Sequence, residues 1–447
     1  MTATSPPLTR TAAPPAMVGR WALWAVVAVN LVIVEVLFVT AGSGKNSLLT
    51  IAKFLGLHVA LIMMLQLTLV ARLPWLDRRI GMDRLTAWHR WVGFTLLWTV
   101  LLHAGFVTVG YATLDNAPVL KTFLTLAGIF ASLIGICAAA IIVVAASFSI
   151  RYARRRLQYE TWHAIHVLLY VAVGLGLLHQ FLEGTTFRSS PLATAYWWTL
   201  WTLVVVSLIV GRIVMPLWRN AYHQFRVAAV VPESDNVVSV HVTGRHLDRL
   251  PARAGQFFIW RFLGHNGWWK ANPVSRSQAP DGRSLRLTAK AVGATSAGLR
   301  QLPVGTRVFA EGPYGAFTAM HQTRDDILLI AGGVGITPVR SLLEESTGSV
   351  IVLYRVHTEA DAVLLDELRE LARTRDARVH LLTGRTGAGS PPNAPFEPNN
   401  LINLVPDIRD RDVFVCGPPA MTSAVLRSLR TLDVPRHQVH AERFSLA

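Results

Sequence analysis

The stretch 88-WHRWVGFTLLWTVLLHAG-105 is apolar enough to lie in lipid, yet it carries His89 near its start and His103 near its end. These two residues are 14 positions apart, which corresponds to about 21 Å along a helix axis. Fourteen steps of about 100° return to within about 40° of the starting direction, so both rings lie on one side of the helix. Two imidazoles at different depths of one apolar helix predict a membrane span with a function.

A second stretch, 162-WHAIHVLLYVAVGLGLLHQ-180, repeats this arrangement with His166 and His179, which are 13 positions apart. Their ideal directions differ by about 140°, and a local backbone adjustment at the two glycines before His179 would bring the rings onto one side. His163 lies one turn before His166 and is an alternative to it as a ligand. Helix packing is the plain alternative for any single histidine, but four such residues favour paired metal ligands.

The composition divides the chain into a membrane part and a part typical of soluble proteins. Of the 447 residues, 52% are hydrophobic and 16% are charged, which is a low charge content for a soluble protein. The formal net charge is +16, but the arginines lie in several short loops rather than in one patch, so we expect no nucleic-acid partner. Two cysteines, Cys137 and Cys416, provide neither a disulfide framework nor the ligands of an iron–sulfur cluster.

Six apolar stretches are long enough to cross about 30 Å of hydrocarbon. Arginines gather in the N-terminal tail, in the loop 71–84 and in the run 151–156, whereas the other loops are poor in Arg and Lys. The positive-inside rule then predicts a multi-pass protein of the cell membrane whose N- and C-termini are both cytoplasmic. The predicted spans are 21–41, 50–70, 88–110, 119–148, 160–181 and 195–217.

The third and fifth spans run in the same direction, so their histidines pair across the helices at two depths. We call His89 and His166 the inner pair, and His103 and His179 the outer pair. Two bis-histidine haems, stacked through the membrane, fit this arrangement. Glu35 in the first span is a further intramembrane candidate, without an assigned role.

The chain after residue 220 contains two further kinds of pattern. Short β-like runs separated by Pro/Gly turns predict a small antiparallel barrel, and the alternation of strands and helices after it predicts a parallel α/β sheet. The expected organisation is a tail at 1–18, a membrane domain at 19–219, a barrel at 220–323 and an α/β domain at 324–447.

A glycine-rich turn, 331-AGGVGITP-338, follows an apolar strand and opens a helix. Such glycines let the backbone approach a pyrophosphate, and the free amides of the helix N-terminus can bind it. A second turn after a strand, 415-VCGPPAM-421, makes a dinucleotide site a better interpretation than a purely structural turn. The candidate residues in the two turns are Gly332, Gly333, Gly335, Thr337, Pro338, Gly417 and Pro418.

With these motifs in this order, the chain resembles the NADPH oxidase/ferric reductase flavocytochromes. In that family a ferric-reductase-type membrane domain is joined to a module of the ferredoxin–NADP reductase superfamily. The resemblance covers nearly the whole chain after residue 20, and the histidine spacings of 14 and 13 match those of the family's haem ligands. It implies a six-helix haem bundle, an FAD-binding antiparallel β-barrel and an NADP-binding α/β domain.

The resemblance also implies the flavin contacts. The strand 255-GQFFIW-260 followed by 272-NPVS-275 is similar to the flavin-binding motif, but Asn272 lacks its cation and Val274 lacks its aromatic ring. Arg276 is expected to supply a cation. The run 290-KAVGATSAGLRQL-302 is similar to the segment that holds the FAD phosphates. The implied flavin-site residues are Asn272, Pro273, Val274, Ser275, Arg276, Thr295, Ser296 and Ala297.

On the nicotinamide side, Cys416 and Pro418 match the wall beside the ring, and Phe444 resembles the terminal aromatic that covers the flavin. Arg355 follows the second strand of the α/β pattern, where an arginine suits a 2′-phosphate, and Arg385 assists it. These residues predict NADPH, with NADH as the other candidate. Two solvated surface arginines are the alternative interpretation.

The resemblance implies that NADPH gives a hydride to FAD, which passes single electrons through two b-type haems to an acceptor outside. Both molecular oxygen, giving superoxide, and ferric chelates, giving ferrous iron, suit that role. Electron supply to a membrane or extracytoplasmic redox partner is an alternative. A haem-binding sensor or anchor with an inactive reductase module, and a membrane-anchored flavin reductase without haem, are the others.

Overall fold

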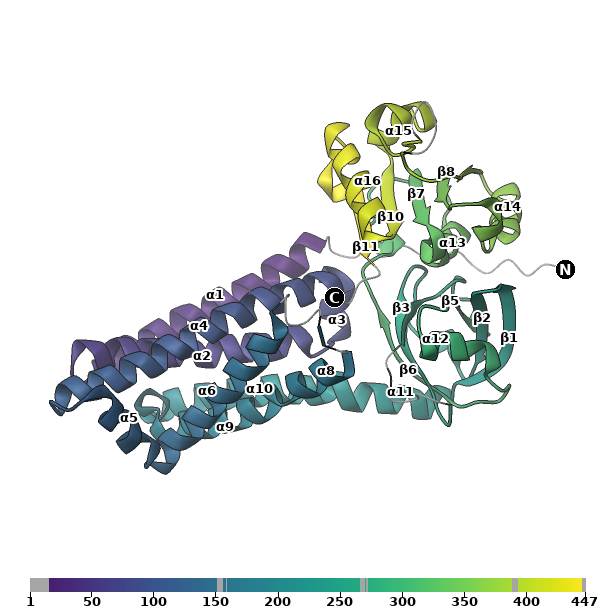
Figure 1. The fold of residues 1–447 in the computed structure, drawn as a ribbon. Coiled ribbons are helices and arrows are strands. Elements are labelled where there is room, and N and C mark those ends of the chain that lie inside the picture. Colours follow the sequence, from purple (N-terminus) through teal and green to yellow (C-terminus); the bar gives the residue numbers. More distant parts are fainter. Residues whose placement is uncertain are drawn as a thin grey trace. The chain divides into compact units, whose positions relative to one another are not determined.

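The computed structural model describes residues 16–150, 156–157, 159–265, 270, 272–387 and 393–443 (Figure 1). Within this part of the chain, six helices are long and apolar enough to cross a membrane. The prediction of a multi-pass membrane protein is therefore confirmed. The six helices are Val18–Thr40, Ser47–Val70, Arg84–Leu114, Phe130–Ser149, Glu160–Glu183 and Pro191–His223.

Internal contacts divide the chain into two compact units. The membrane unit contains Arg20–Leu73 and Arg84–Arg212, and the second unit contains Pro74–Asp83 together with the chain from Ile213 onward. The segment Pro74–Asp83 lies between two spans in sequence but packs with the second unit. The domain boundaries expected at residues 19, 220 and 324 remain a prediction.

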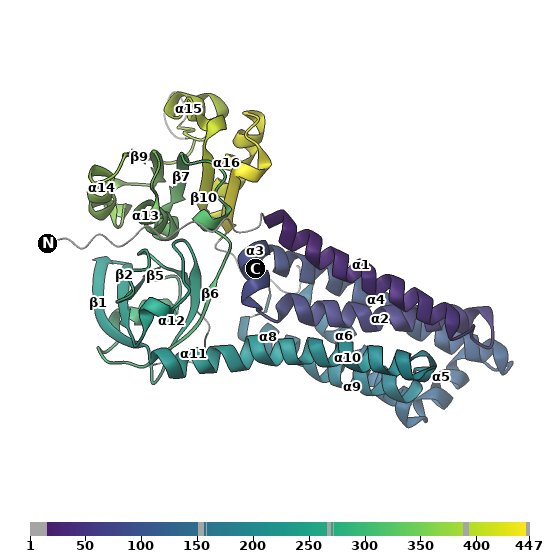
Figure 2. The same ribbon diagram turned by 180° about the vertical axis from the view of Figure 1, so that it is seen from behind.

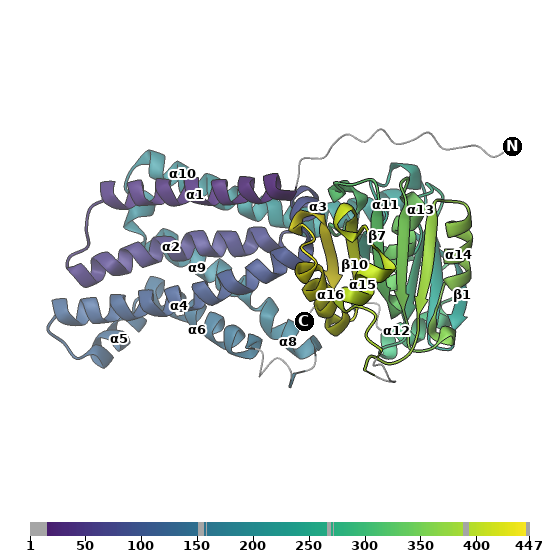
Figure 3. The same cartoon turned by 90° about the horizontal axis from the view of Figure 1, so that it is seen from above.

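The long helices of the membrane unit run roughly parallel to one another (Figure 3). Side-chain caps fix two of the starts: Asn46 accepts the N–H of Leu49, and Ser190 accepts the N–H of Ala193, which satisfies backbone donors that a helix leaves free. Long helices of this unit include α1 (Ala16–Thr40), α2 (Ser47–Val70), α4 (Met82–Leu114) and α10 (Pro191–Ile209). A π-helical segment, Val210–Val214, continues α10 toward the end of the sixth span.

The fourth predicted span, 119–148, consists of two helices rather than one. The first is α5 (Val119–Ala127), and the second is α6 (Phe130–Ser149), which alone has the length of a span. α5 ends at Gly128, whose N–H turns back to the carbonyls of the last turn.

The fifth span also has a break, and it lies at Leu168 rather than at the two glycines that the sequence pointed to. Leu168 separates α8 (Tyr159–Val167) from α9 (Leu169–Glu183). Its N–H bonds to the carbonyl of Ile165, three residues back, which tightens one turn of the helix. The adjustment therefore falls between His166 and His179.

Aromatic side chains fill the centre of the membrane unit. Trp197 and Trp201 on α10 are fully buried, and Phe187 stacks on Trp197 with ring centroids 4.3 Å apart. They pack against Leu57 and Met63 of α2. In the same unit, α6 packs along α9, so the histidine-bearing helix α9 has its own neighbour.

The antiparallel domain is confirmed as six strands in two three-stranded sheets, joined by single bridges rather than closed into one continuous sheet. Trp260, Phe258 and Leu287 form its core with the surrounding apolar side chains. One sheet has the order β1 (Arg226–Ser234), β2 (Val237–Thr243), β5 (Leu285–Lys290), and the other has the order β4 (Asn272–Ser275), β3 (Phe257–Phe262), β6 (Val308–Tyr314). The short helix α12 (Ala294–Gly298) follows β5.

The α/β domain is confirmed as a five-stranded parallel sheet of order β11-β10-β7-β8-β9. Helices α13 and α14 lie on one face, and α15 and α16 lie on the other (Figure 2). The elements are β7 (Ile327–Gly332), α13 (Ile336–Glu345), β8 (Val350–Arg355), α14 (Leu365–Arg373), β9 (Ala377–Leu382), α15 (Pro398–Leu404), β10 (Asp412–Gly417), α16 (Pro419–Thr431) and β11 (Val439–Arg443).

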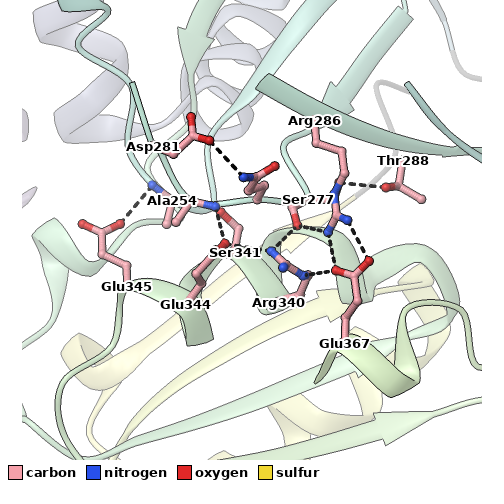
Figure 4. A network of polar contacts seen from close by, with 12 residues as sticks. Ala254, Ser277, Asp281, Arg286, Thr288, Arg340, Ser341, Glu344, Glu345 and Glu367 are labelled. Atoms are coloured by element: carbon pink, nitrogen blue, oxygen red, sulfur yellow. Dashed lines mark hydrogen bonds and ion pairs between the residues drawn. The ribbon is translucent and has the colours of Figure 1, made fainter. Parts of the chain in front are cut away.

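A polar network joins the antiparallel domain to the α/β domain within the second unit (Figure 4). Glu367 on α14 binds Arg286 of β5 through two bonds of 2.8 Å and Arg340 of α13 through one of 2.8 Å. Arg340 also donates to the carbonyl of Ser277 and to Glu344. Because both guanidinium groups are buried, the carboxylate between them fixes how the two domains meet.

We expect Glu367→Gln to lower the free energy of unfolding by about 1–3 kcal/mol, because Arg286 then keeps a buried charge without its carboxylate. Urea denaturation of the detergent-purified chain, followed by near-ultraviolet circular dichroism, measures this. Glu370→Gln on the same helix removes an exposed pair with Arg373 and should change the value by less than about 0.5 kcal/mol. Equal effects of the two substitutions would contradict the role of Glu367.

The same variant has a predicted pH dependence. Burial by itself raises the pKa of Glu367, but the hydrogen bonds and charges of Arg286 and Arg340 outweigh it and leave the pKa below the ordinary value of 4.5. The stabilisation is therefore complete above that value and is lost as the pH falls through the lower pKa of the folded state. The difference between Glu367→Gln and the wild type should shrink in acid.

Candidate functional site

The structure brings His89 and His166 of the inner pair together. Their ring centroids are 6.1 Å apart and their planes differ by 70°. A metal bound to one nitrogen of each ring at about 2 Å would place the centroids about 6 Å apart. Trp162 stacks on His166 at 4.9 Å, whereas His163 is exposed. The geometry thus favours His166 over His163 as the partner of His89.

The outer pair is held from behind by backbone carbonyls. Nδ1 of His103 lies 2.8 Å from the carbonyl of Ala52, and Nδ1 of His179 lies 2.8 Å from the carbonyl of Ala131. A carbonyl only accepts, so each Nδ1 carries the proton, and each Nε2 is left with its lone pair for a metal.

Together these contacts fit a bis-histidine haem at each depth. The separation of the inner rings leaves room for one metal atom, and the outer rings have the tautomer that a metal needs. Glu35 does not join either pair, because its carboxylate lies 3.2 Å from Nε2 of His58.

In the second unit, the strand β4 presents its residues to two different faces. Val274 and Asn272 stand opposite Phe258 and Trp260, whose side chains form the domain core, and directly opposed residues share a face. Val274 packs on that core and Asn272 donates to the carbonyl of Trp260. The two residues that depart from the flavin motif thus support the strand itself.

Ser275 lies on the other face of β4, opposite Phe257. Its hydroxyl is buried and has no hydrogen-bond partner among the described residues. Phe257 in turn pairs with Tyr314 at the end of β6. A buried hydroxyl of this kind is a suitable partner for a polar edge of a bound flavin.

The two predicted turns meet at the carboxyl ends of β7 and β10. A side chain at Gly332 would come within 2.8 Å of Pro418, and one at Gly335 would collide with the carbonyl of Cys416. Gly333 has φ +53° and faces open space. The backbone is thus bare on the side where a pyrophosphate would lie. Thr337 and Pro338 begin α13 and are buried.

Cys416 is fully buried, and its neighbour in the sheet is Glu442 of β11. A side chain on Gly315 would lie 3.7 Å from the Glu442 carboxylate and 3.2 Å from Phe257. Glu442 therefore connects the Cys416 strand to the face that carries Ser275. The sequence reasoning missed Glu442, although it lies two residues before Phe444; Phe444 itself lies outside the described residues.

Arg355 closes β8 and donates to the carbonyl of Thr383 at 2.6 Å. Burial lowers its pKa, but an arginine remains charged. The loop that it holds carries Arg385, which is exposed. The two arginines predicted to bind a 2′-phosphate thus belong to neighbouring strand ends.

The structure shows few side-chain contacts for the residues expected around the FAD phosphates. Ser296 accepts the N–H groups of Val292 and Gly293 and so caps α12. Ala297 is exposed, and the side chain of Thr295 lies outside the described residues.

Arg276 is a buried cation without a hydrogen bond. Its side chain is fully buried, and none of its three guanidinium nitrogens has a partner among the described residues. Burial lowers the pKa of Arg276 to about 10, against the opposite effect of Asp281, Glu344 and Glu345. Such a group is costly unless it binds an anion, so it fits a role in holding a phosphate.

The edge of β6 is held by residues that the sequence reasoning did not single out. Asn220 of α11 (Met215–His223) both accepts from and donates to the backbone of Ala310, and Arg219 donates to Gly312. Asp77 of α3 (Pro74–Ile80) accepts the N–H of Gly315 at 2.8 Å. These side chains occupy an edge that would otherwise be unpaired.

Comparisons with known proteins match both the membrane part and the α/β part of the chain. The family "Ferric reductase like transmembrane component" matches residues 55–177, and "Oxidoreductase NAD-binding domain" matches residues 329–427. Over 186 residues the chain is 32% identical to ferredoxin–NADP reductase B of Sorangium cellulosum, covering 38% of this chain and 76% of that protein. The chain belongs to the ferredoxin–NADP reductase family. Its membrane part is the ferric-reductase-like component that the resemblance predicted.

The chain also resembles reductase components of other enzyme systems. The chain is 32% identical over 238 residues to the ferredoxin reductase component of 3-ketosteroid-9-alpha-monooxygenase from Mycobacterium tuberculosis, covering 49% of this chain and 65% of that protein. Among solved structures, the cytochrome P450 reductase GcoB of Amycolatopsis has 23% identity and a TM-score of 0.42, covering 50% of this chain and 69% of that one. The chain thus spans about two thirds of these reductases. It is a membrane flavoprotein and an NAD(P)H-linked oxidoreductase.

We expect Arg276→Met to weaken FAD binding about tenfold or more, since a charge-assisted bond to a phosphate contributes about 1.5–3 kcal/mol. Fluorescence titration of FAD-depleted protein measures the dissociation constant. Arg283→Met, which removes an exposed arginine nearby, is the matched control. Unchanged FAD affinity in Arg276→Met would contradict this role, whatever the effect of the substitution on stability.

Proposed function

We propose that the protein is a transmembrane oxidoreductase that carries electrons from cytoplasmic NADPH through FAD and two b-type haems to an extracytoplasmic acceptor. The observation that carries this proposal is the arrangement of the four membrane histidines. The inner rings are spaced for one metal atom, and the outer rings have their Nδ1 atoms held by carbonyls. Histidines that only packed between helices would need neither this ring spacing nor these hydrogen bonds.

Each part of the chain has a role in this scheme. FAD would convert a hydride into single electrons, and haem would carry those electrons one at a time. Arg355 and Arg385 bind the 2′-phosphate of NADPH, and the turn at Gly333, which has open space beside it, admits its pyrophosphate. Cys416 forms the wall beside the nicotinamide and keeps water out.

On the flavin side, the Ser275 hydroxyl offers a hydrogen bond to the ring, and Glu442 lies where a carboxyl can exchange a proton near it. By the resemblance, Phe444 would cover the flavin. The phosphates of FAD are held by Arg276 and by the backbone of Thr295, Ser296 and Ala297.

His103 and His179 would hold the outer haem, which would supply single electrons to an acceptor at that depth of the membrane. Oxygen, giving superoxide, and a ferric chelate, giving ferrous iron, are both suited to reaction there. The arginine-rich loops support an orientation with both termini in the cytoplasm.

A second candidate is electron supply to a redox partner. Its support is that the relatives named above include a ferredoxin reductase component. In that case the purified protein would reduce oxygen and ferric chelates only slowly, and a partner protein rapidly.

The proposal is tested by a visible spectrum of the detergent-purified protein, first oxidised and then after NADPH addition under nitrogen, with haem and FAD quantified. Two b-type haems per chain that NADPH reduces are the expected result. Haem without NADPH oxidation would instead indicate a sensor or anchor. FAD without haem would leave a membrane-anchored flavin reductase.

We expect His103→Ala and His179→Ala each to remove one haem per chain and to leave hydride transfer from NADPH to FAD intact. Pyridine haemochrome assays and stopped-flow flavin reduction measure the two effects. His58→Ala, which removes an intramembrane histidine paired with Glu35, should keep both haems. Full haem content in the His103 or His179 variant would contradict the ligand assignment.

Arg355→Ala should reduce the preference for NADPH over NADH about tenfold or more, because a charge-assisted bond to the 2′-phosphate is lost. The ratio of kcat/KM values for the two nucleotides measures this. Arg375→Ala, an exposed arginine of the same domain, is the control. A ratio that stays the same would assign Arg355 to the support of its loop alone.

A further inference from the structure

Two glycines of the membrane unit lie directly against the outer histidines. A Cβ added to Gly56 on α2 would come within 2.9 Å of the His103 ring, and one added to Gly135 on α6 would come within 2.8 Å of the His179 ring. Real Cβ atoms do not approach other atoms so closely. The rings therefore occupy the space that a larger residue would need.

At both histidines, the accepting carbonyl lies four residues before the glycine in the sequence. His103 donates to the carbonyl of Ala52, four residues before Gly56, and His179 donates to the carbonyl of Ala131, four residues before Gly135. A helical side chain points toward the N-terminus and covers the turn before it. A side chain at the fourth residue would thus cover the carbonyl that the imidazole must reach.

We infer that Gly56 and Gly135 are positioning residues that expose these two carbonyls and so fix the tautomer and orientation of the outer haem ligands. The inference rests on the proposed haem function. Gly105 on α4 and Gly174 on α9, in contrast, have nothing within 4 Å of an added Cβ. Close packing also occurs at Gly93, against Gln66, and at Gly110, against Leu49, but those contacts involve no histidine ring.

The inner pair is held differently. Nδ1 of His166 lies 3.5 Å from the hydroxyl of Ser149, which also accepts the indole N–H of Trp162 at 3.2 Å. Nδ1 of His89 is buried without a hydrogen bond of normal geometry among the described residues. The outer ligands should therefore donate more strongly to their metal than the inner ligands, since a bonded Nδ1–H raises the basicity of an imidazole.

The test compares Gly56→Ala and Gly135→Ala with the matched controls Gly105→Ala and Gly174→Ala in the full-length, detergent-purified protein. Haem content, the low-spin ferric electron paramagnetic resonance signals and a redox titration give readouts that do not depend on turnover. FAD content and the signal of the inner haem report correct folding.

We expect each test variant to weaken retention of one haem about 10–100-fold, or to keep that haem with a shifted resonance signal and a more positive midpoint potential. The controls should match the wild type. Unchanged signals in both test variants, or loss of both haems together while FAD is retained, would overturn the inference. A wild type without haem would instead refute the proposed function.

Discussion

A polar ring inside an apolar helical bundle needs a partner from the protein, because no water is available to supply one. The membrane unit meets this requirement with atoms of the facing helix. Carbonyls of α2 and α6 take the Nδ1 protons of His103 and His179, and the hydroxyl of Ser149 lies at Nδ1 of His166. These contacts decide which nitrogen stays free, and hence which chemistry the bundle can support.

The second unit meets a related requirement at the edge of a sheet. Strand β6 would present unpaired backbone groups, and Asn220, Arg219 and Asp77 occupy them. Asp77 comes from the segment between the second and third spans, and the other two lie in α11, at the end of the sixth span. Two segments at the ends of membrane spans therefore hold the β6 edge of this sheet.

The sequence predicted what depends on periodicity and spacing. Six apolar stretches, the alternation of β7, α13, β8 and α14, and the two glycine turns were all visible in the order of residues. The break at Leu168, the helix α3 and the contact between the strands of Cys416 and Glu442 were not. Each of these depends on which segments meet in space, and a single sequence carries no record of that.

The departures from the flavin motif show the same limit. From sequence, Asn272 and Val274 are losses, because they bring no cation and no aromatic ring. In the structure Val274 packs on the core of the antiparallel domain and Asn272 donates to the carbonyl of Trp260. Ser275 and Arg276 instead carry buried polar groups that have no partner among the described residues. Buried donors without acceptors are costly in a finished fold. The buried polar groups of Ser275 and Arg276 therefore support a bound anionic cofactor better than the residue types in the motif do.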